Sequence, residues 1–398
     1  MTARTRPGEP SLGPLPVGGT VLVGVGLALA LGLLALDPGL LPLAGVLASA
    51  ALVAGLVRVR GELVGTWAAL ALRHRLRRRE LAPAPPDEGL GLPALDAGLG
   101  PLTVVDGRDH DGRPLALLGD EHGAWSAVLA PDVEELPLLL DPPDAGGRGA
   151  DWVGAGVGGF PLPALADTLH DRGVVLDAVT VVRHVRPGAD DGPARDAHRE
   201  VLGPLADAAH RSSWLVVRLD PDRCPGAVAE RGGGVLGARR ALVGALARIG
   251  RVLADAGVPV RPLERDGLRE AVALAAGVDL DRTPGGTQER WDAVVVGEVG
   301  HATWVATALG PDAAPLDLDA LVAGDAVGTV ALALVADDGP DEVGADLHVR
   351  VTARTPEAIT EAGRRLVAGA RGRGLRLEPL HGRHGAGLRA TLPLGARP

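Results

Sequence analysis

The chain has 398 residues, of which 46% are apolar, and its formal net charge is −10. Its single cysteine excludes an intrachain disulfide and a cysteine-based zinc site, and its lack of lysine excludes a Walker A phosphate loop. Residues 1–79 hold nine arginines against three acidic residues, a net charge of +6, so residues 80–398 carry −16 and should repel nucleic acid.

Two uncharged apolar runs near the N-terminus predict a transmembrane hairpin. They span residues 17–36 and 40–57, and only Asp37-Pro38-Gly39 separates them. A helix rises about 1.5 Å per residue, so runs of this length can cross the roughly 30 Å hydrocarbon core of a bilayer. Small residues recur four apart in the second run, which lets helix backbones approach closely. These pairs are Ala44 with Ala48 and Ala51 with Gly55.

The arginines around the hairpin predict its orientation. Two precede it and seven follow it within residues 58–79, whereas the turn holds only Asp37. By the positive-inside rule, both termini are cytoplasmic and the protein is a multi-pass plasma-membrane protein. A cleaved signal peptide is the alternative, because Ala48-Ser49-Ala50 resembles a cleavage site, but the apolar region of a signal is usually about 7–15 residues long. We therefore expect a cytoplasmic tail at 1–16, the hairpin at 17–57 and a basic juxtamembrane helix at 58–80.

Residues 81–101 predict a linker, and residues 102–398 a folded cytoplasmic body. The linker holds five prolines and four glycines, a composition that disfavours a helix or an interior strand. Short β segments at 102–105, 115–118 and 125–130 predict a small meander, and seven glycines within 141–161 predict an exposed loop.

Helices and strands then alternate along the body. Helices are expected at 162–171, 194–209, 225–230, 236–256 and 267–276, with strands at 174–185, 214–219 and 258–263. This rhythm predicts an α/β fold with a partly parallel sheet, although an α+β fold is also compatible. The last third adds strands at 291–296, 302–308, 327–336, 347–352 and 375–380 and a helix at 356–371. The sequence leaves open a subdivision near residue 290, and it shows no internal repeat.

Two glycine motifs match the G-x-G-x-x-G pattern of dinucleotide-binding loops. One is formed by Gly154, Gly156 and Gly159, and the other by Gly232, Gly234 and Gly237. That pattern binds phosphate where a strand leads directly into the turn, but here a glycine-rich loop and a predicted short helix precede the two motifs. The second motif opens a long helix with Arg239 and Arg240 nearby. A membrane-tethered domain that binds a nucleotide or nucleotide-sugar is therefore the alternative function.

The remaining motifs have structural explanations, so we predict no catalytic, cofactor-binding or metal-binding residue and no enzymatic activity. Asp220-Pro221 is expected to end a strand and cap the next short helix, and the glycines of residues 231–234 permit positive φ between two helices. Cys224 is expected to be a packing residue. His381 and His384 are expected in a loop, without a nearby carboxylate to complete a metal site.

Residues 214–234, WLVVRLDPDRCPGAVAERGGG, resemble the EccE family, the E component of the actinobacterial type VII (ESX) secretion system. The likeness lies in a tryptophan-led strand that ends in Arg218-Leu219-Asp220-Pro221, the nearby Cys224, the run Arg231 to Gly234, and the closing Pro393-Leu394-Gly395. Family members similarly begin with two membrane helices and an arginine-rich exit. The resemblance covers most of the chain and is strongest over residues 162–276 and at the C-terminus, whereas residues 281–325 match no pattern.

The resemblance implies a structural subunit that stabilises a protein-secretion complex in the plasma membrane and does not itself hydrolyse ATP. The implied partners are EccB, the EccC ATPase and EccD, with the mycosin protease nearby and the lipid bilayer around the hairpin. The residues themselves support the membrane anchor. A stand-alone adaptor of an unrelated membrane system is a third interpretation.

Overall fold

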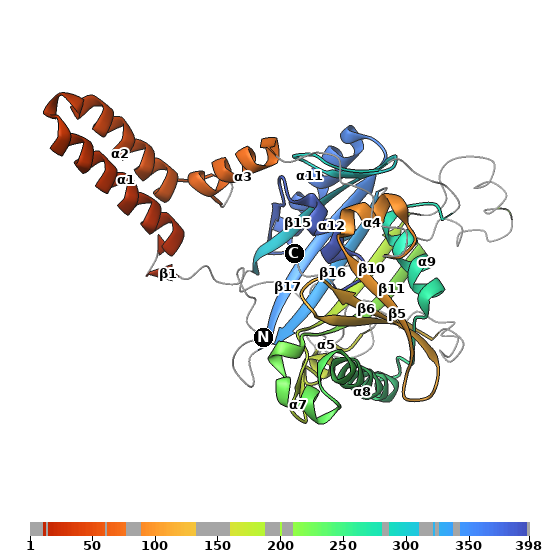
Figure 1. The fold of residues 1–398 in the computed structure, drawn as a ribbon. Helices are drawn as coiled ribbons and strands as arrows, with labels where there is room; N and C mark the ends of the chain where they lie inside the picture. Colours follow the sequence, from red (N-terminus) through yellow and green to blue (C-terminus); the bar gives the residue numbers. More distant parts are fainter. Residues whose placement is uncertain are drawn as a thin grey trace. The chain divides into compact units, whose positions relative to one another are not determined.

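The computed structural model describes residues 11–12, 15–59, 62–76, 89–132, 160–187, 200, 210–280, 286–309, 321–322, 326–336 and 343–395. The chain divides into two compact units, residues 4–78 and residues 79–398 together with 1–3. The first unit contains the red helices of Figure 1, and the second contains the large sheet.

The N-terminal unit is built around a pair of apolar helices, α1 (Val17–Leu36) and α2 (Leu41–Leu56). The short 3₁₀ helix η1 (Pro38–Leu40) joins them, and the Asp37 side chain caps it by accepting a 2.8 Å hydrogen bond from the Gly39 N–H. Small residues form the contact, because a Cβ on Gly26 would collide with the Cβ of Ala51. Two short strands and a third helix follow: β3 (Arg58–Val59), β4 (Glu62–Leu63) and α3 (Val64–Leu76).

The predicted small-residue spacing matches the burial in α2. Ala44, Ala51 and Gly55 are buried there, and Ala48 is half-buried. Among the described residues one helical run, Pro38–Leu56, is long and apolar enough to cross a membrane, and the apolar helix Thr20–Leu36 is shorter. The helical pair is therefore present, while two membrane crossings stay a prediction.

A twelve-stranded sheet forms the centre of the C-terminal unit (Figure 1). Its strand order is β13-β14-β15-β17-β16-β10-β11-β7-β6-β5, with β12 also paired to β7 and β18 to β15. The strands are β5 (Leu102–Arg108), β6 (Pro114–Asp120), β7 (Trp125–Pro131), β10 (Ala178–Arg186), β11 (His210–Leu219), β12 (Val260–Pro262), β13 (Thr287–Glu289), β14 (Val294–Val296), β15 (Val299–Leu309), β16 (Val327–Ala336), β17 (Val343–Ala353) and β18 (Leu375–Pro379).

Helices cover both faces of this sheet. They are α4 (Pro93–Leu99), α5 (Leu162–Ala166), α7 (Pro225–Glu230), α8 (Gly234–Asp255), α9 (Arg265–Ala276), α11 (Pro356–Gly372) and α12 (His384–Thr391). The 3₁₀ helix η4 (Pro221–Arg223) precedes α7, and a small hairpin, β8 (His170–Asp171) with β9 (Val174–Val175), follows α5.

The expected parallel pairing is wrong, because every described ladder of the sheet is antiparallel. The helix α8 does connect two strands that run in the same direction, β11 and β12, but β7 lies between them and pairs with both. In the same way α11 connects β17 and β18, which flank β15. The alternation of strand and helix is therefore confirmed from β11 to α9, but each of these two crossovers straddles a third strand. The architecture is a mixed α/β fold on a large antiparallel sheet.

The sheet also contains a topological duplication that the sequence does not reveal. The order β5-β6-β7-β10-β11-α8-β12-α9 along the chain repeats as β13-β14-β15-β16-β17-α11-β18-α12. The two sets of strands occupy mirrored places in the sheet and meet at the β10–β16 ladder. The body therefore consists of two similarly connected halves on one continuous sheet.

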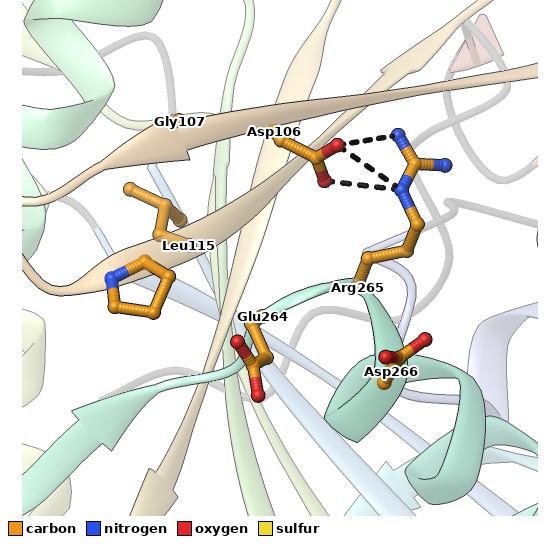
Figure 2. A pocket seen from close by; sticks show the side chains of 7 residues that line it. Asp106, Gly107, Leu115, Glu264, Arg265 and Asp266 are labelled. Carbon is orange, nitrogen blue, oxygen red and sulfur yellow. Dashed lines mark hydrogen bonds and ion pairs between the residues drawn. The ribbon is translucent and has the colours of Figure 1, made fainter.

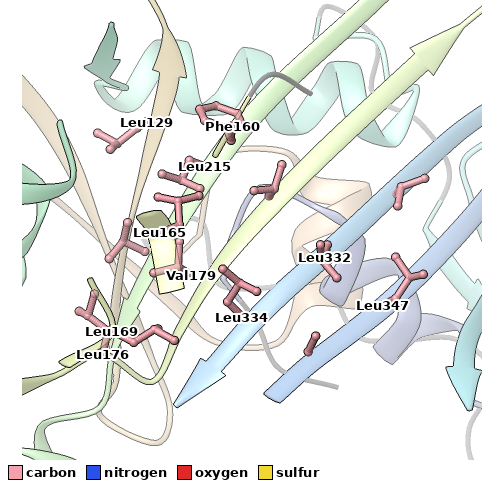
Figure 3. Packing of buried hydrophobic residues seen from close by; sticks show 14 of the residues in the cluster. Leu129, Phe160, Leu165, Leu169, Leu176, Val179, Leu215, Leu332, Leu334 and Leu347 are labelled. Atoms are coloured by element: carbon pink, nitrogen blue, oxygen red, sulfur yellow. The ribbon is translucent and has the colours of Figure 1, made fainter. Parts of the chain in front are cut away.

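Side-chain alternation along the strands separates two apolar layers. In β10, Val179 and Val181 join the layer that α8 and α11 cover, whereas Val182 joins the layer of α4, α9 and α12. Figure 3 shows the first layer, where Phe160 packs among leucines of the sheet and of α5. The chain's single phenylalanine is fully buried there.

Two helices lie where the sequence predicted none. α4 lies within the expected linker, and its Leu95 has no exposed surface. α12 begins at His384, in the segment expected as a loop, and its Gly387 packs against Thr303 so closely that a Cβ would collide with that side chain. The expected helix at 162–171 ends at Ala166. Three predicted features lie outside the described residues: the helix at 194–209 except residue 200, most of the glycine-rich loop at 141–161, and the first G-x-G-x-x-G motif.

Candidate functional site

The two motifs that carry the sequence resemblance meet at the Arg218 side chain. Arg218 lies at the end of β11, and its guanidinium donates 2.9 Å and 2.6 Å hydrogen bonds to the carboxylates of Asp177 and Asp120. A third bond, of 3.1 Å, reaches the carbonyl oxygen of Gly395 in the C-terminal Pro-Leu-Gly run. Arg223 of η4 adds a 3.4 Å contact to the other oxygen of Asp177. We call this set the Arg218 junction; it ties β6, β11, η4 and the residue before β10 to the C-terminal Pro-Leu-Gly run.

Burial makes the charges of this junction interdependent. The side chains of Arg218 and Asp177 are 11% and 5% exposed. Burial alone would raise the pKa of Asp120, but the hydrogen bond and the charge of Arg218 outweigh it and hold that pKa below its usual value. The Asp120 carboxylate therefore stays ionised near neutral pH and acts as a hydrogen-bond acceptor for Arg218.

The C-terminal run is fixed by two further contacts. The Ser126 hydroxyl donates a 2.7 Å hydrogen bond to the Leu394 carbonyl, and Gly395 adopts a φ of +73°. A Cβ at Gly395 would lie 2.9 Å from the Cβ of Ser126, so the close approach requires glycine. The C-terminal run is therefore held by packing and hydrogen bonds and has a structural role.

The local predictions for the Asp220-Pro221 segment are confirmed. Asp220 accepts a 3.0 Å hydrogen bond from the Asp222 N–H and caps η4, and Pro221 lies in the first turn. Cys224 is 4% exposed and belongs to the core. The glycines at 232, 233 and 234 all have positive φ, as expected for a turn between two helices.

The second glycine motif is occupied by packing contacts. A Cβ on Gly237 would collide with the carbonyl oxygen of Val228, so this glycine is where α7 and α8 meet. Arg239 lies over the Trp125 ring at 4.1 Å, and Arg240 donates a 3.1 Å hydrogen bond to the Arg231 carbonyl. Both arginines considered for a phosphate therefore have other partners, which disfavours the nucleotide-binding alternative.

A buried polar row crosses the ladder between the two halves of the sheet. His184, Thr329 and Arg350 are register neighbours on β10, β16 and β17. Thr329 lies 2.9 Å from Nδ1 of His184 and accepts a 3.1 Å hydrogen bond from the Arg350 guanidinium. Arg350 also donates a 2.7 Å bond to the Ala275 carbonyl of α9 and contacts Nδ1 of His301 at 2.9 Å. This row joins both halves and one covering helix.

Electrostatics keep the rings of this row neutral. Burial, assisted by the charge of Arg350, lowers the pKa of His184 to about 3 and that of His301 well below its usual value. Burial also lowers the pKa of Arg350 to about 9. Because a guanidinium can only donate, Nδ1 of His301 must accept from it. No carboxylate of the described residues forms an ion pair with Arg350, whose side chain has no exposed surface, so the row is a core element that solutes do not reach.

This buried polar row was not predicted, although the sequence of β17 contains a pattern that could have indicated it. His348, Arg350 and Thr352 alternate with valines along one strand, which places three polar side chains on one face. Such a pattern normally indicates a solvated face. Here α9 and α12 cover that face, and the sequence of the strand alone does not show this.

A pocket of about 260 Å³ lies between the β5–β6 hairpin and the start of α9 (Figure 2). Asp106, Glu264 and Asp266 bring three carboxylates to it, and Arg265 is its single basic residue. Arg265 donates a 3.0 Å hydrogen bond to Asp106 and a 2.9 Å bond to the Val104 carbonyl. The pocket suits one side chain better than a drug-sized ligand. Within the described part of the chain, no group of three metal-ligating side chains is assembled.

Known proteins resemble part of this chain. Residues 207–306, which include β11, α7, α8, β12 and α9, match the family model described as "EccE: Putative type VII ESX secretion system translocon, EccE". The chain is also 28% identical over 186 residues to "ESX-5 secretion system protein EccE5" of Mycobacterium marinum (strain ATCC BAA-535 / M). That match spans 45% of this chain and 43% of the relative, so less than half of either protein is compared.

Proposed function

We propose that this chain, which matches the EccE family model over residues 207–306, is a structural membrane subunit of a type VII (ESX) secretion complex. The family match, which contains the Arg218 and Asp220-Pro221 segment, carries this proposal. The architecture supports it in two ways: an apolar helical pair can hold the protein in the plasma membrane, and a rigid cytoplasmic body can hold its partners. EccB, the EccC ATPase, EccD and, nearby, the mycosin protease are the partners that we propose.

The surface of the helical pair favours a lipid environment. Leu31, Leu41 and Val46 are 66%, 63% and 67% exposed, which is typical of lipid-facing positions and costly in water. We propose that α1 and α2 both cross the membrane and that both termini are cytoplasmic, because arginines flank the pair on both sides.

Cysteine labelling tests this topology directly. In a Cys224→Ser background, Pro38→Cys places a thiol at the turn of the hairpin and Ala68→Cys places one in α3. A membrane-impermeant maleimide should label position 38 in intact cells and position 68 only after permeabilisation. Labelling of both positions in intact cells would show a single crossing and overturn the two-pass proposal, and labelling of position 68 alone would overturn the proposed orientation.

Co-purification tests the assembly role. Full-length tagged protein from its native host in mild detergent should bring EccB, EccC and EccD, as identified by mass spectrometry. Gly26→Val should reduce this recovery, because a side chain there collides with Ala51 and separates α1 from α2. Gly24→Val is the matched control, since a Cβ at Gly24 meets nothing within 4 Å. Recovery of the tagged protein without any of these components would contradict the proposed function.

A further inference from the structure

The strand β5 forms an edge of the sheet and shows an open row of backbone groups. It pairs with β6 and has no second neighbour among the described strands. The Asp109 N–H donates to the Arg113 carbonyl, so hydrogen-bonded pairs alternate down the hairpin from that point. The N–H and C=O groups of Leu102, Val104 and Asp106 therefore point away from β6, toward the open side.

Only part of this open row is covered. The Gly89 N–H bonds the Leu102 carbonyl at 3.0 Å, and the Arg265 guanidinium bonds the Val104 carbonyl at 2.9 Å. The Arg265 guanidinium thus donates to a backbone carbonyl that a neighbouring strand would otherwise use. Its ion pair with Asp106 is a surface contact, with side chains 42% and 69% exposed, so displacing it costs little free energy.

The topological duplication gives an internal comparison for this edge. β13 occupies the equivalent place at the other end of the sheet, but it has three residues against seven in β5. Its Thr287 and Glu289 are buried, and Gly98 of α4 packs against Thr287. One end of the sheet is short and covered, whereas the other is long and accessible.

We propose that β5 and the adjacent acidic pocket bind an extended, basic segment of a partner protein. The segment adds a strand beside β5, so that one of its backbone N–H groups replaces Arg265 at the Val104 carbonyl. One of its arginine or lysine side chains enters the pocket and replaces Arg265 at Asp106. Strand addition supplies backbone hydrogen bonds, and a pocket for alternate side chains supplies selectivity. Charge determines the kind of partner. Three carboxylates surround one arginine in the pocket, and residues 80–398 carry a net charge of −16, which disfavours a second copy of this chain.

This inference deepens the proposed function, because it names the chemistry of one partner contact, but its test uses the purified full-length protein in detergent without other components. The probe is a fluorescein-labelled eight-residue peptide that alternates arginine with valine and threonine. We expect saturable binding by fluorescence anisotropy, and no binding of the same peptide with glutamate in place of arginine. A failure here with successful co-purification would overturn the edge proposal alone, and the reverse pattern would overturn the scaffold proposal alone.

Two pairs of variants test the geometry. Val104→Pro removes an outward N–H without breaking the β6 ladder, so it should weaken peptide binding about fivefold, the effect of one hydrogen bond, while Val104→Ala binds like the parent. Asp106→Asn should weaken binding and reduce its salt dependence, whereas Asp111→Asn in the nearby turn should not. Equal binding by Val104→Pro and the parent would overturn the proposal. So would a change in the oligomeric mass of the peptide-free protein in Val104→Pro, because the edge would then pair two copies of this chain.

Discussion

Removal of the Arg218 side chain should destabilise the body far more than loss of a surface arginine. Arg218→Ala deletes three hydrogen bonds and leaves the Asp177 carboxylate, 5% exposed, with the 3.4 Å contact to Arg223 as its remaining arginine bond in the described structure. Breaking a buried ion pair in this way costs about 3 kcal/mol. The matched control is Arg364→Ala, which removes an exposed pair in α11 with side chains 73% and 49% exposed and should cost about 0.5 kcal/mol or less.

Urea unfolding of the full-length protein in detergent, followed by tryptophan fluorescence, measures this difference. With a slope of about 3 kcal/mol per molar urea, the midpoint of Arg218→Ala should fall by about 1 M and that of Arg364→Ala by less than about 0.2 M. Arg218→Lys should lie between them, because one ammonium keeps the charge but does not reach three acceptors. Equal midpoints for Arg218→Ala and Arg364→Ala would refute the structural role of the Arg218 junction. The motif would then need a functional explanation.

Two further predictions concern α8 and the buried polar row. Gly237→Ala should destabilise the body by about 2 kcal/mol, because the added methyl group collides with the Val228 carbonyl. Gly250→Ala in the same helix meets nothing within 4 Å and should raise the melting temperature. A higher melting temperature for both variants would contradict the packing role of Gly237. The pKa of His184 is about 3 in the folded protein and 6.5 for the free group, so the unfolded chain binds the proton first as the pH falls. The stability that the neutral His184 ring contributes is complete above pH 6.5 and is lost between pH 6.5 and 3. The parent should therefore lose about 2 kcal/mol of unfolding free energy between pH 7 and pH 5 that His184→Gln keeps, as measured by urea unfolding at both pH values. An unchanged pH profile in this variant would show that the ring is not held neutral.

The sequence predicts individual elements well where local chemistry determines them. The strand at Val327–Ala336 and the short helix at Pro225–Glu230 match their predicted bounds. An almost continuous apolar run defines the first, and the Cys224-Pro225 start defines the second. α4 was missed because prolines and glycines were taken as a sign of a linker. Pro93 in its first turn and Gly100 just after its end are the residues that favour a helix at those positions.

Strand pairing and the candidate site depend on contacts between distant residues. Nothing near α8 indicates that β7 separates β11 from β12, because β7 precedes α8 in the chain by about a hundred residues. The meeting of Arg218 with Gly395 joins residues 177 positions apart. The sequence resemblance selected both motifs, but their contact follows only from the tertiary structure.

The most direct test of the scaffold role is the state of the secretion complex in cells that lack this protein. Membrane extracts of a deletion strain, resolved on native gels and probed for EccC, should show loss of the assembled complex, and expression of the full-length chain should restore it. A variant without residues 17–57 should not restore it. An assembled complex of unchanged mass and amount in the deletion strain would contradict the account.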